Sequence, residues 1–300
     1  MSVILLLAFP LLVLGAVYAF LYFTGFEEEG VNINRVNDMF VNVIPFVTSI
    51  VIIWFLIAFW AHNAMIGMAT GSKPLSRKEN KRVYNLVENL CMQDGMKMPK
   101  VNVIEDPGLN AFASGLREKD YTVTLTRGII EKLDDEELEG VIAHELMHIK
   151  NKDVRLLVIS IIFVGIFSFL VQVLFRSVLY SSISNRRNKD GGKAVLIALV
   201  IALVAFLLSL VFKFALSRKR EYMADSGAAE MTRNPKALAG ALRKISGRSE
   251  IETVKSDDVK EMFIEHKPDK ENSAGLLSSI SGLFATHPPI EKRIQYLEQF

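Results

Sequence analysis

Cysteine and net charge are both scarce in this sequence of 300 residues. The one cysteine, Cys91, excludes a disulfide within the chain. It stands in an apolar row at helical spacing, which indicates a small buried hydrophobe rather than a nucleophile or a metal ligand. The 35 Lys and Arg residues nearly balance the 33 Asp and Glu residues, so the net charge of +2 gives no sign of nucleic-acid binding. We therefore expect no nucleic-acid partner.

Charge is absent altogether from four stretches, which are residues 3–23, 41–61, 156–175 and 194–212. A helix of about 20 apolar residues spans the roughly 30 Å of hydrocarbon in a bilayer. The alternative is a buried core helix of a large soluble protein, but four such runs in one chain of this length argue against it. We predict four membrane helices. The first stretch resembles a signal peptide in position only, since it lacks a basic start and a cleavage site, and we expect it to be retained.

The apolar stretches set the expected order of segments. This order is membrane helix 1–23, external loop 24–40, membrane helix 41–61, a first polar part 62–155, membrane helix 156–175, loop 176–193, membrane helix 194–216 and a second polar part 217–300. The loop 24–40 is acidic, whereas Lys and Arg cluster after the second helix. By the positive-inside rule, the N-terminus and the first polar part are cytoplasmic. The basic loop 176–193 breaks this rule unless the third and fourth helices form a re-entrant hairpin, and both arrangements stay open.

The polar parts predict a mainly α fold of the α+β class with a small β-sheet. The expected helices are residues 76–93, opened by a capping-box pattern at Ser76 and Glu79, then 134–150, 217–231 and 235–246, and the expected strands are residues 101–105 and 121–126. Residues 247–273 are charged and irregular, which indicates a mobile loop.

One of these helices carries two histidines four residues apart, in the sequence H-E-L-M-H from His144 to His148. This spacing places both imidazoles on one helical face, about 6 Å apart, where they can bind one Zn²⁺. Glu145 comes round beside the open coordination site and can take a proton from a water there. The alternative is an accidental pair on a solvated face, but the chain has only 5 histidines and the pair lies on a helix, as the chemistry needs.

A catalytic zinc needs a third protein ligand. His62 follows the second membrane helix and His266 lies in the expected mobile loop, so both fit ordinary surface or interfacial residues. Glu221 is the better candidate, because Glu221 and Asp225 share one helix face. One carboxylate can bind the metal while the other accepts a hydrogen bond from a ligating imidazole. The alternative for this pair is a surface cluster with neighbouring basic residues.

Four motifs in order make the chain resemble the HtpX-type membrane zinc metallopeptidases, gluzincins related to the CAAX prenyl endopeptidases. The motifs are Asn110-Ala111-Phe112-Ala113, H-E-L-M-H followed by residues 149–153, R-E-Y-M-A-D at residues 220–225, and T-H-P-P at residues 286–289 with Arg293. The resemblance covers nearly the whole chain. The chain departs from it in lacking basic residues after Met1 and in carrying Tyr222 where Phe is common.

The resemblance implies roles for these residues. His144, His148 and Glu221 would bind one Zn²⁺ per subunit, Glu145 would be the general base and acid, and Asp225 would support a ligand. It further implies that His287 stabilises the oxyanion, whereas a structural alternative makes His287 a cap of the final helix. Residues 110–113 would form the edge strand against which an extended substrate lies, and the alternative is a tight turn.

If His148 and Glu221 bind one metal, the two apolar stretches between them cross the membrane an even number of times. Short spacers separate both residues from those stretches, which places the zinc near the cytoplasmic membrane surface. The expected activity is hydrolysis of peptide bonds in membrane proteins or unfolded proteins. The four apolar stretches predict a multi-pass protein whose partner is the lipid bilayer. The resemblance implies that it lies in the cell membrane and cuts misfolded or damaged membrane proteins in quality control and the stress response. Oligomeric state stays open.

Two other classes of function compete with this interpretation. A selective processing enzyme of the prenyl-protein type would be expected to have more membrane helices around a large chamber. A non-enzymatic membrane scaffold would carry a structural zinc, which is fully ligated by protein, usually through cysteine, and has no use for Glu145.

Overall fold

The computed structural model describes residues 10–159, 218–251, 262–264 and 288–300 together with residues 200 and 204, and within these ranges it leaves out residues 12, 16, 20, 23–25, 28, 29, 248 and 250. The chain divides into two compact units, residues 1–60 with 160–212 and residues 61–159 with 213–300. Nearly all of the predicted membrane helices at 156–175 and 194–216 lies outside the described residues. The part of the chain that is described is mostly helical and contains a small mixed sheet, as the sequence predicts.

Helix α2, Ile33–Thr70, is the helix in the described ranges that is long and apolar enough to cross a membrane. It extends the predicted span 41–61 at both ends, so that its first turns take in part of the predicted loop 24–40. The side chain of Asn32 accepts a hydrogen bond from the backbone N–H of Arg35, at 3.1 Å, which caps the start. Gly71, with φ of 66°, lets the backbone turn after the last residue. Before α2, strand β1 (Phe26–Glu27) pairs with β2 (Gly30–Val31).

The second unit contains a four-stranded sheet in the order β3-β4-β6-β5. The strands are β3 Lys73–Pro74, β4 Lys100–Ile104, β5 Ala111–Ser114 and β6 Thr122–Thr126. Strands β4 and β6 are the two predicted from the sequence, and they pair in parallel. Strand β5 pairs antiparallel with β6 and comes last in the order, so the segment assigned to a substrate strand does lie at an edge of this sheet.

The second unit also contains helices. They are α3 Lys81–Gln93, α4 Arg127–Lys132, α5 Asp135–Lys150, α8 Arg218–Thr232, α9 Pro235–Ile245 and α12 Ile290–Leu297, with a short 3-10 helix at Glu118–Asp120. Helix α3 starts later than the pattern at Ser76 and Glu79 predicts. The two residues do bond to each other, but Asn80 caps the helix by accepting from the N–H of Val83 at 3.0 Å.

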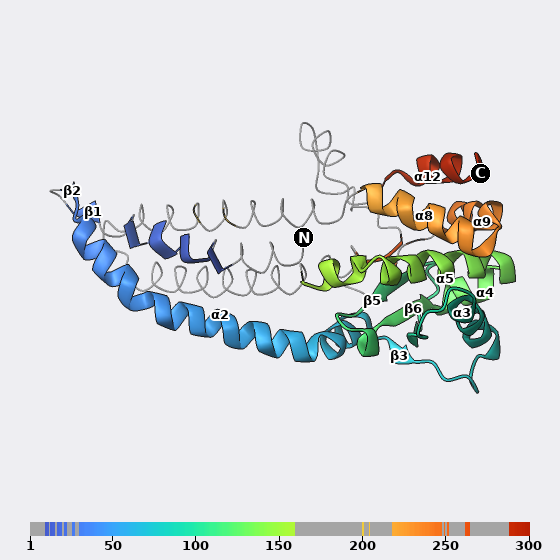
Figure 1. The fold of residues 1–300 in the computed structure, drawn as a ribbon, viewed down its shortest axis with the longest axis horizontal. Helices are drawn as coiled ribbons and strands as arrows, with labels where there is room; N and C mark the ends of the chain where they lie inside the picture. Colours follow the sequence, from blue (N-terminus) through green and yellow to red (C-terminus); the bar gives the residue numbers. More distant parts are fainter. Residues whose placement is uncertain are drawn as a thin grey trace. The chain divides into compact units, whose positions relative to one another are not determined.

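Helix α5 is the centre of this unit (Figure 1), and it runs between the sheet on one side and α8 with α9 on the other. A capping box starts it, because Asp134 accepts from the N–H of Glu137 while the Glu137 side chain accepts from the N–H of Asp134. Gly140 allows close approach to α9, since a Cβ added there would lie 3.1 Å from the backbone of Leu238. Burial on nearly every face fixes this helix, and with it the two histidines.

Most of the stretch 247–273, for which the composition predicts a mobile loop, lies outside the described residues, and that prediction stays a prediction. Of its described residues Gly247 is exposed, whereas Ser249, Ile251 and residues 262–264 are buried. Phe263 and Ile264 are 2% and 3% exposed. The ring of Phe263 packs edge-on against Phe112 of β5, with centroids 5.0 Å apart. Phe263 and Ile264 thus hold residues 262–264 against β5.

Candidate metal centre

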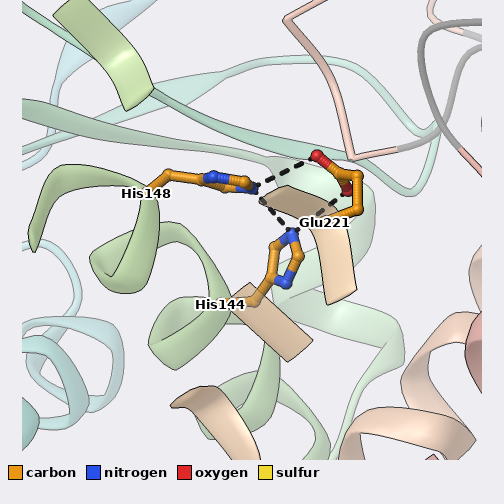
Figure 2. A group of neighbouring side chains, drawn as sticks. All are labelled: His144, His148 and Glu221. Carbon is orange, nitrogen blue, oxygen red and sulfur yellow. Dashed lines mark hydrogen bonds and ion pairs between the residues drawn. The ribbon is translucent and has the colours of Figure 1, made fainter. Parts of the chain in front are cut away.

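Two helices bring the three predicted ligands together. His144 and His148 come from successive turns of α5, and Glu221 comes from the first turn of α8 (Figure 2). The two Nε2 atoms lie 3.1 Å apart. Oxygens of Glu221 lie 3.8 Å from Nε2 of His144 and 3.5 Å from Nε2 of His148. No other such cluster of His, Cys, Asp and Glu occurs among the residues that the structure describes.

These three side chains can bind one tetrahedral ion. Ligand atoms about 2.0–2.2 Å from Zn²⁺ at the corners of a tetrahedron lie roughly 3.3–3.6 Å from one another. The two Nε2 atoms are 3.1 Å apart, and they lie 3.8 and 3.5 Å from different oxygens of Glu221. With one ligand atom taken from each residue, all three atoms lie within 4.8 Å of one another, close enough to bind one ion. Two nitrogens and one carboxylate also match the donor set of a catalytic zinc, which leaves one corner for water.

His144 is oriented by Asp225 from the next turn of α8. Its Nδ1 lies 3.0 Å from Oδ1 of Asp225, whose side chain is fully buried. Arg293 of α12 grips the same carboxylate with two bonds, Nε to Oδ2 at 2.9 Å and Nη2 to Oδ1 at 2.7 Å. Its Nη1 lies 3.3 Å from Oε2 of Glu221. Because Nδ1–H of His144 donates to Asp225, the lone pair of Nε2 faces Glu221 and His148.

His148 has a carboxylate partner of its own. Its Nδ1 lies 3.2 Å from Oδ2 of Asp153, a residue just beyond the end of α5. The other oxygen of Asp153 accepts from Nη1 of Arg220, which directly precedes Glu221 in α8. Both imidazoles therefore have Nδ1 bound to a carboxylate and Nε2 facing the other ligands.

The charges around the site favour a cation. Burial alone would lower the pKa of His148, but its bond to Asp153 and the charges of Glu221 and Glu145 outweigh burial and raise this pKa to about 9. Burial alone would raise the pKa of Asp225, yet the Arg293 guanidinium and the bond from His144 hold it below its usual range. Carboxylates that stabilise a proton on His148 stabilise a metal cation for the same reason.

Glu145 lies beside the two histidines on α5 and is 3% exposed. Burial raises the pKa of this carboxyl, and positive charge on His144 or His148 opposes that rise. A carboxylate whose pKa is raised is a better proton acceptor near neutral pH. The position and the environment of Glu145 thus suit a general base.

The predicted substrate edge is partly occupied by the chain itself. The N–H of Ile264 donates to the carbonyl oxygen of Ala111 at 2.9 Å. Nδ2 of Asn110 donates to the carbonyl of Ser249 at 3.0 Å. Phe112 and Ala113 are buried. The segment is an extended strand, so the tight-turn alternative fails for Ala111–Ser114.

The remaining histidines lie elsewhere or beyond the described residues. His62 is 2% exposed and is not among the clustered ligands, so its burial contradicts a surface position. His266 and His287 lie outside the described residues, and their predicted roles stay predictions. Pro289 occupies the N-cap position of α12.

Sequence reasoning gave no role to Asp153 or Arg293. Asp153 is five residues from His148, a spacing that an unbroken helix would not bring into contact with it. Arg293 lies 68 residues from Asp225 in sequence, so only tertiary structure joins the two. The one available signal was the position of both residues in motifs that carry the family resemblance.

The chain is similar to known peptidases. The family model described as Peptidase family M48 matches residues 77–300. The Protease HtpX homolog of Bacteroides fragilis is 57% identical over 308 residues, which cover 100% of this chain and 95% of that protein. The Protease HtpX homolog of Listeria monocytogenes serotype 4a is 37% identical over 257 residues, which cover 82% of each.

Among solved structures, the crystal structure of S. mikatae Ste24p is similar to this chain with a TM-score of 0.49 and 18% sequence identity. The similarity covers 84% of this chain and 57% of that one.

Proposed function

The chain belongs to peptidase family M48 as an HtpX-type metalloprotease, and on this premise we propose that its metal is one Zn²⁺ bound by His144, His148 and Glu221. As a membrane-associated metalloprotease it hydrolyses peptide bonds, so a non-enzymatic scaffold is excluded. One observation carries the zinc proposal. Both imidazoles bind a carboxylate through Nδ1, and both turn Nε2 toward the carboxylate of Glu221.

When bound, Zn²⁺ acidifies a water and polarises the scissile carbonyl. Glu145 accepts the proton of the attacking water on its carboxylate and later delivers it to the leaving amine nitrogen. Asp225 and Asp153 keep the two imidazoles in the tautomer whose Nε2 is a lone-pair donor. Arg293 neutralises Asp225 and one oxygen of Glu221, so that the buried carboxylates do not repel one another.

An extended substrate adds to the edge strand β5, and Asn110, Ala111, Phe112 and Ala113 provide that edge. Main-chain hydrogen bonds recognise any sequence, which suits an enzyme that acts on many unfolded segments. The position of β5 at the sheet edge, next to α5, supports this proposal. His287 has the role of stabilising the oxyanion.

The natural substrates are misfolded or damaged membrane proteins, cut at the cytoplasmic face of the cell membrane in quality control and the stress response. The chain is multi-pass, with four hydrophobic helices and a zincin-like catalytic domain in the two parts 62–155 and 217–300. Support comes from the four uncharged stretches and from the distribution of Lys and Arg along the chain. The apolar, largely unburied span of α2 agrees with a membrane anchor.

The experiment uses the full chain in detergent, with metal removed during purification to prevent self-cleavage. Zn²⁺ is then added together with casein as an unfolded substrate. We expect the wild type to cut casein, and Glu145→Gln to bind Zn²⁺ with near wild-type affinity but to cut at least 100-fold more slowly, on the order of a general-base contribution.

The matched control is Glu139→Gln, which removes a different carboxylate from the same helix. It should cut as the wild type does. Equal cleavage by wild type and Glu145→Gln would discard the mechanism, and unchanged zinc binding by His144→Ala would discard the ligand set.

A further inference from the structure

Asp153 contacts both halves of the candidate metal centre. One carboxylate oxygen bonds Nδ1 of His148 at 3.2 Å, and the other bonds Nη1 of Arg220. His148 belongs to α5, whereas Arg220 belongs to α8 and directly precedes the ligand Glu221. The Asp153 side chain is only 12% exposed, and that of Arg220 is 25% exposed. A single, mostly buried carboxylate thus joins one ligand to the neighbour of another.

The backbone before Asp153 is shaped to make this contact. Helix α5 ends at Lys150, and Lys152 has a φ of 61° in the left-handed region. That conformation costs a residue with a Cβ roughly 1 kcal/mol or more. It interrupts the helix before residues 153–159 continue helically, and it places Asp153 against the face of α5 that carries His148.

We propose that Asp153 is a positioning residue which, through its bonds to His148 and Arg220, aligns the α5 and α8 halves of the metal site before an ion binds. The inference rests on the proposed zinc site. Asp225 and Arg293 perform the corresponding task for His144, so each imidazole has one carboxylate and each carboxylate has one arginine. Losing a carboxylate that orients a ligating histidine typically weakens metal binding about 10- to 100-fold.

A purely structural role for Asp153 predicts something different. Asp153 is the first residue of a helical segment, where an acidic side chain stabilises the helix start through the dipole. In that case its loss would lower the stability of the protein and leave the zinc affinity unchanged. The two roles therefore separate when affinity and stability are measured together.

The test measures the dissociation constant of Zn²⁺ by competition with a chromogenic chelator, using the full chain in detergent in a Glu145→Gln background that cannot cut itself. We expect Asp153→Asn to weaken zinc binding about 10- to 100-fold. Arg220→Gln should weaken it less, because His148 keeps its carboxylate. The double variant should lose less than the product of the two single effects, since both act through one carboxylate.

Two further measurements separate positioning from folding. Co²⁺ replaces Zn²⁺, and its visible absorption reports ligand geometry, so Asp153→Asn should change this spectrum. The matched control is Asp120→Asn. Asp120 pairs with Arg117, with Nε and Oδ2 2.5 Å apart, and neither residue belongs to the metal site. This variant should leave the affinity and the spectrum unchanged.

Wild-type affinity and an unchanged Co²⁺ spectrum in Asp153→Asn would overturn the inference, whatever happens to its melting temperature. Should that variant fail to fold, Arg220→Gln and Arg220→Lys decide. Weaker zinc binding in Arg220→Gln, with partly restored binding in Arg220→Lys, supports positioning. Unchanged zinc binding in both variants contradicts it. Absence of zinc binding in the Glu145→Gln parent, or full binding after His144→Ala, would instead refute the zinc site itself.

Discussion

Arg293 is a fully buried cation that pairs with two carboxylates. Its side chain is 1% exposed, and it bonds Asp225 through two nitrogens while approaching Glu221 at 3.3 Å. A buried charge of this kind gives little net stability when paired, but it is costly to break on one side. The main effect of removing Arg293 would therefore be to leave the buried carboxylates of Asp225 and Glu221 without their counter-charge.

We predict that Arg293→Gln lowers the free energy of unfolding of the metal-free protein by about 3–5 kcal/mol, because two buried carboxylates lose their counter-charge. Denaturant unfolding in detergent, followed by circular dichroism, measures this. The control is Arg127→Gln, whose arginine pairs with Glu105 at the surface, and we expect a change of less than about 1 kcal/mol. Equal effects of the two variants would contradict the account of the buried pair.

Cys91 is a buried thiol, as its apolar row predicts. Burial, with a smaller contribution from Asp94, raises its pKa to about 11. Because the thiolate is the reactive form, a rise in pKa from 9.0 to about 11 reduces the reactive fraction near pH 8 roughly 100-fold. Iodoacetamide should therefore label the folded protein at least about 100-fold more slowly than the denatured protein. Rapid labelling of the folded protein would mean that the thiol is accessible.

At the scale of elements, α5 determines where the site lies. Gly140 and Gly227 allow α9 and α8 to approach it, but in different ways. A Cβ at Gly140 would meet the backbone of Leu238 at 3.1 Å, whereas a Cβ at Gly227 would meet the flexible end of Met147. A helix backbone is much harder to displace than the end of a methionine side chain.

We predict that Gly140→Ala lowers the free energy of unfolding by about 1–3 kcal/mol, because overpacking forces two helices apart. Gly227→Ala should change it by less than about 1 kcal/mol, because Met147 can move and alanine favours the helix. Thermal unfolding of both variants provides the comparison. A larger loss in Gly227→Ala would show that the side chain of Met147 cannot adjust.

The sequence predicted those elements whose signals are local. Asp134 and Glu137 indicate the start of α5. The spacing of His144 and His148 predicts their shared helix face without any tertiary information. The start of α3 was predicted too early because two capping patterns overlap, one at Ser76 and one at Asn80. The bonds of Arg293 and Asp153 could not be predicted, since one depends on distant segments and the other on an unusual φ at Lys152.

At the scale of the whole molecule, one ion would join residues that lie 73 positions apart, as the numbers of His148 and Glu221 show. A ligand that binds only the folded state stabilises it by about 2.7 kcal/mol at 100 times its dissociation constant. We predict that a zinc chelator abolishes proteolysis and lowers the melting temperature, and that added Zn²⁺ restores both. A melting temperature that does not change with Zn²⁺ would contradict binding of one ion by residues of both α5 and α8.

The predicted orientation can be tested in membrane vesicles. In a Cys91→Ser background, a cysteine at the exposed Lys97 should react with an impermeant thiol reagent only in inside-out vesicles. A cysteine in place of Glu28 should react only in right-side-out vesicles. The reverse pattern would place the polar parts outside the cell.

The bond from Ile264 to Ala111 gives β5 an internal competitor. A peptide that adds to this strand at Ala111 has to replace the hydrogen bond that Ile264 already makes there. Since Ile264 is tethered, its effective concentration at the strand is on the order of millimolar. The measured affinity of a peptide for β5 therefore reports the difference in free energy between the peptide's pairing and the pairing of Ile264 with Ala111. Peptides that are dilute, or that pair weakly, do not displace Ile264.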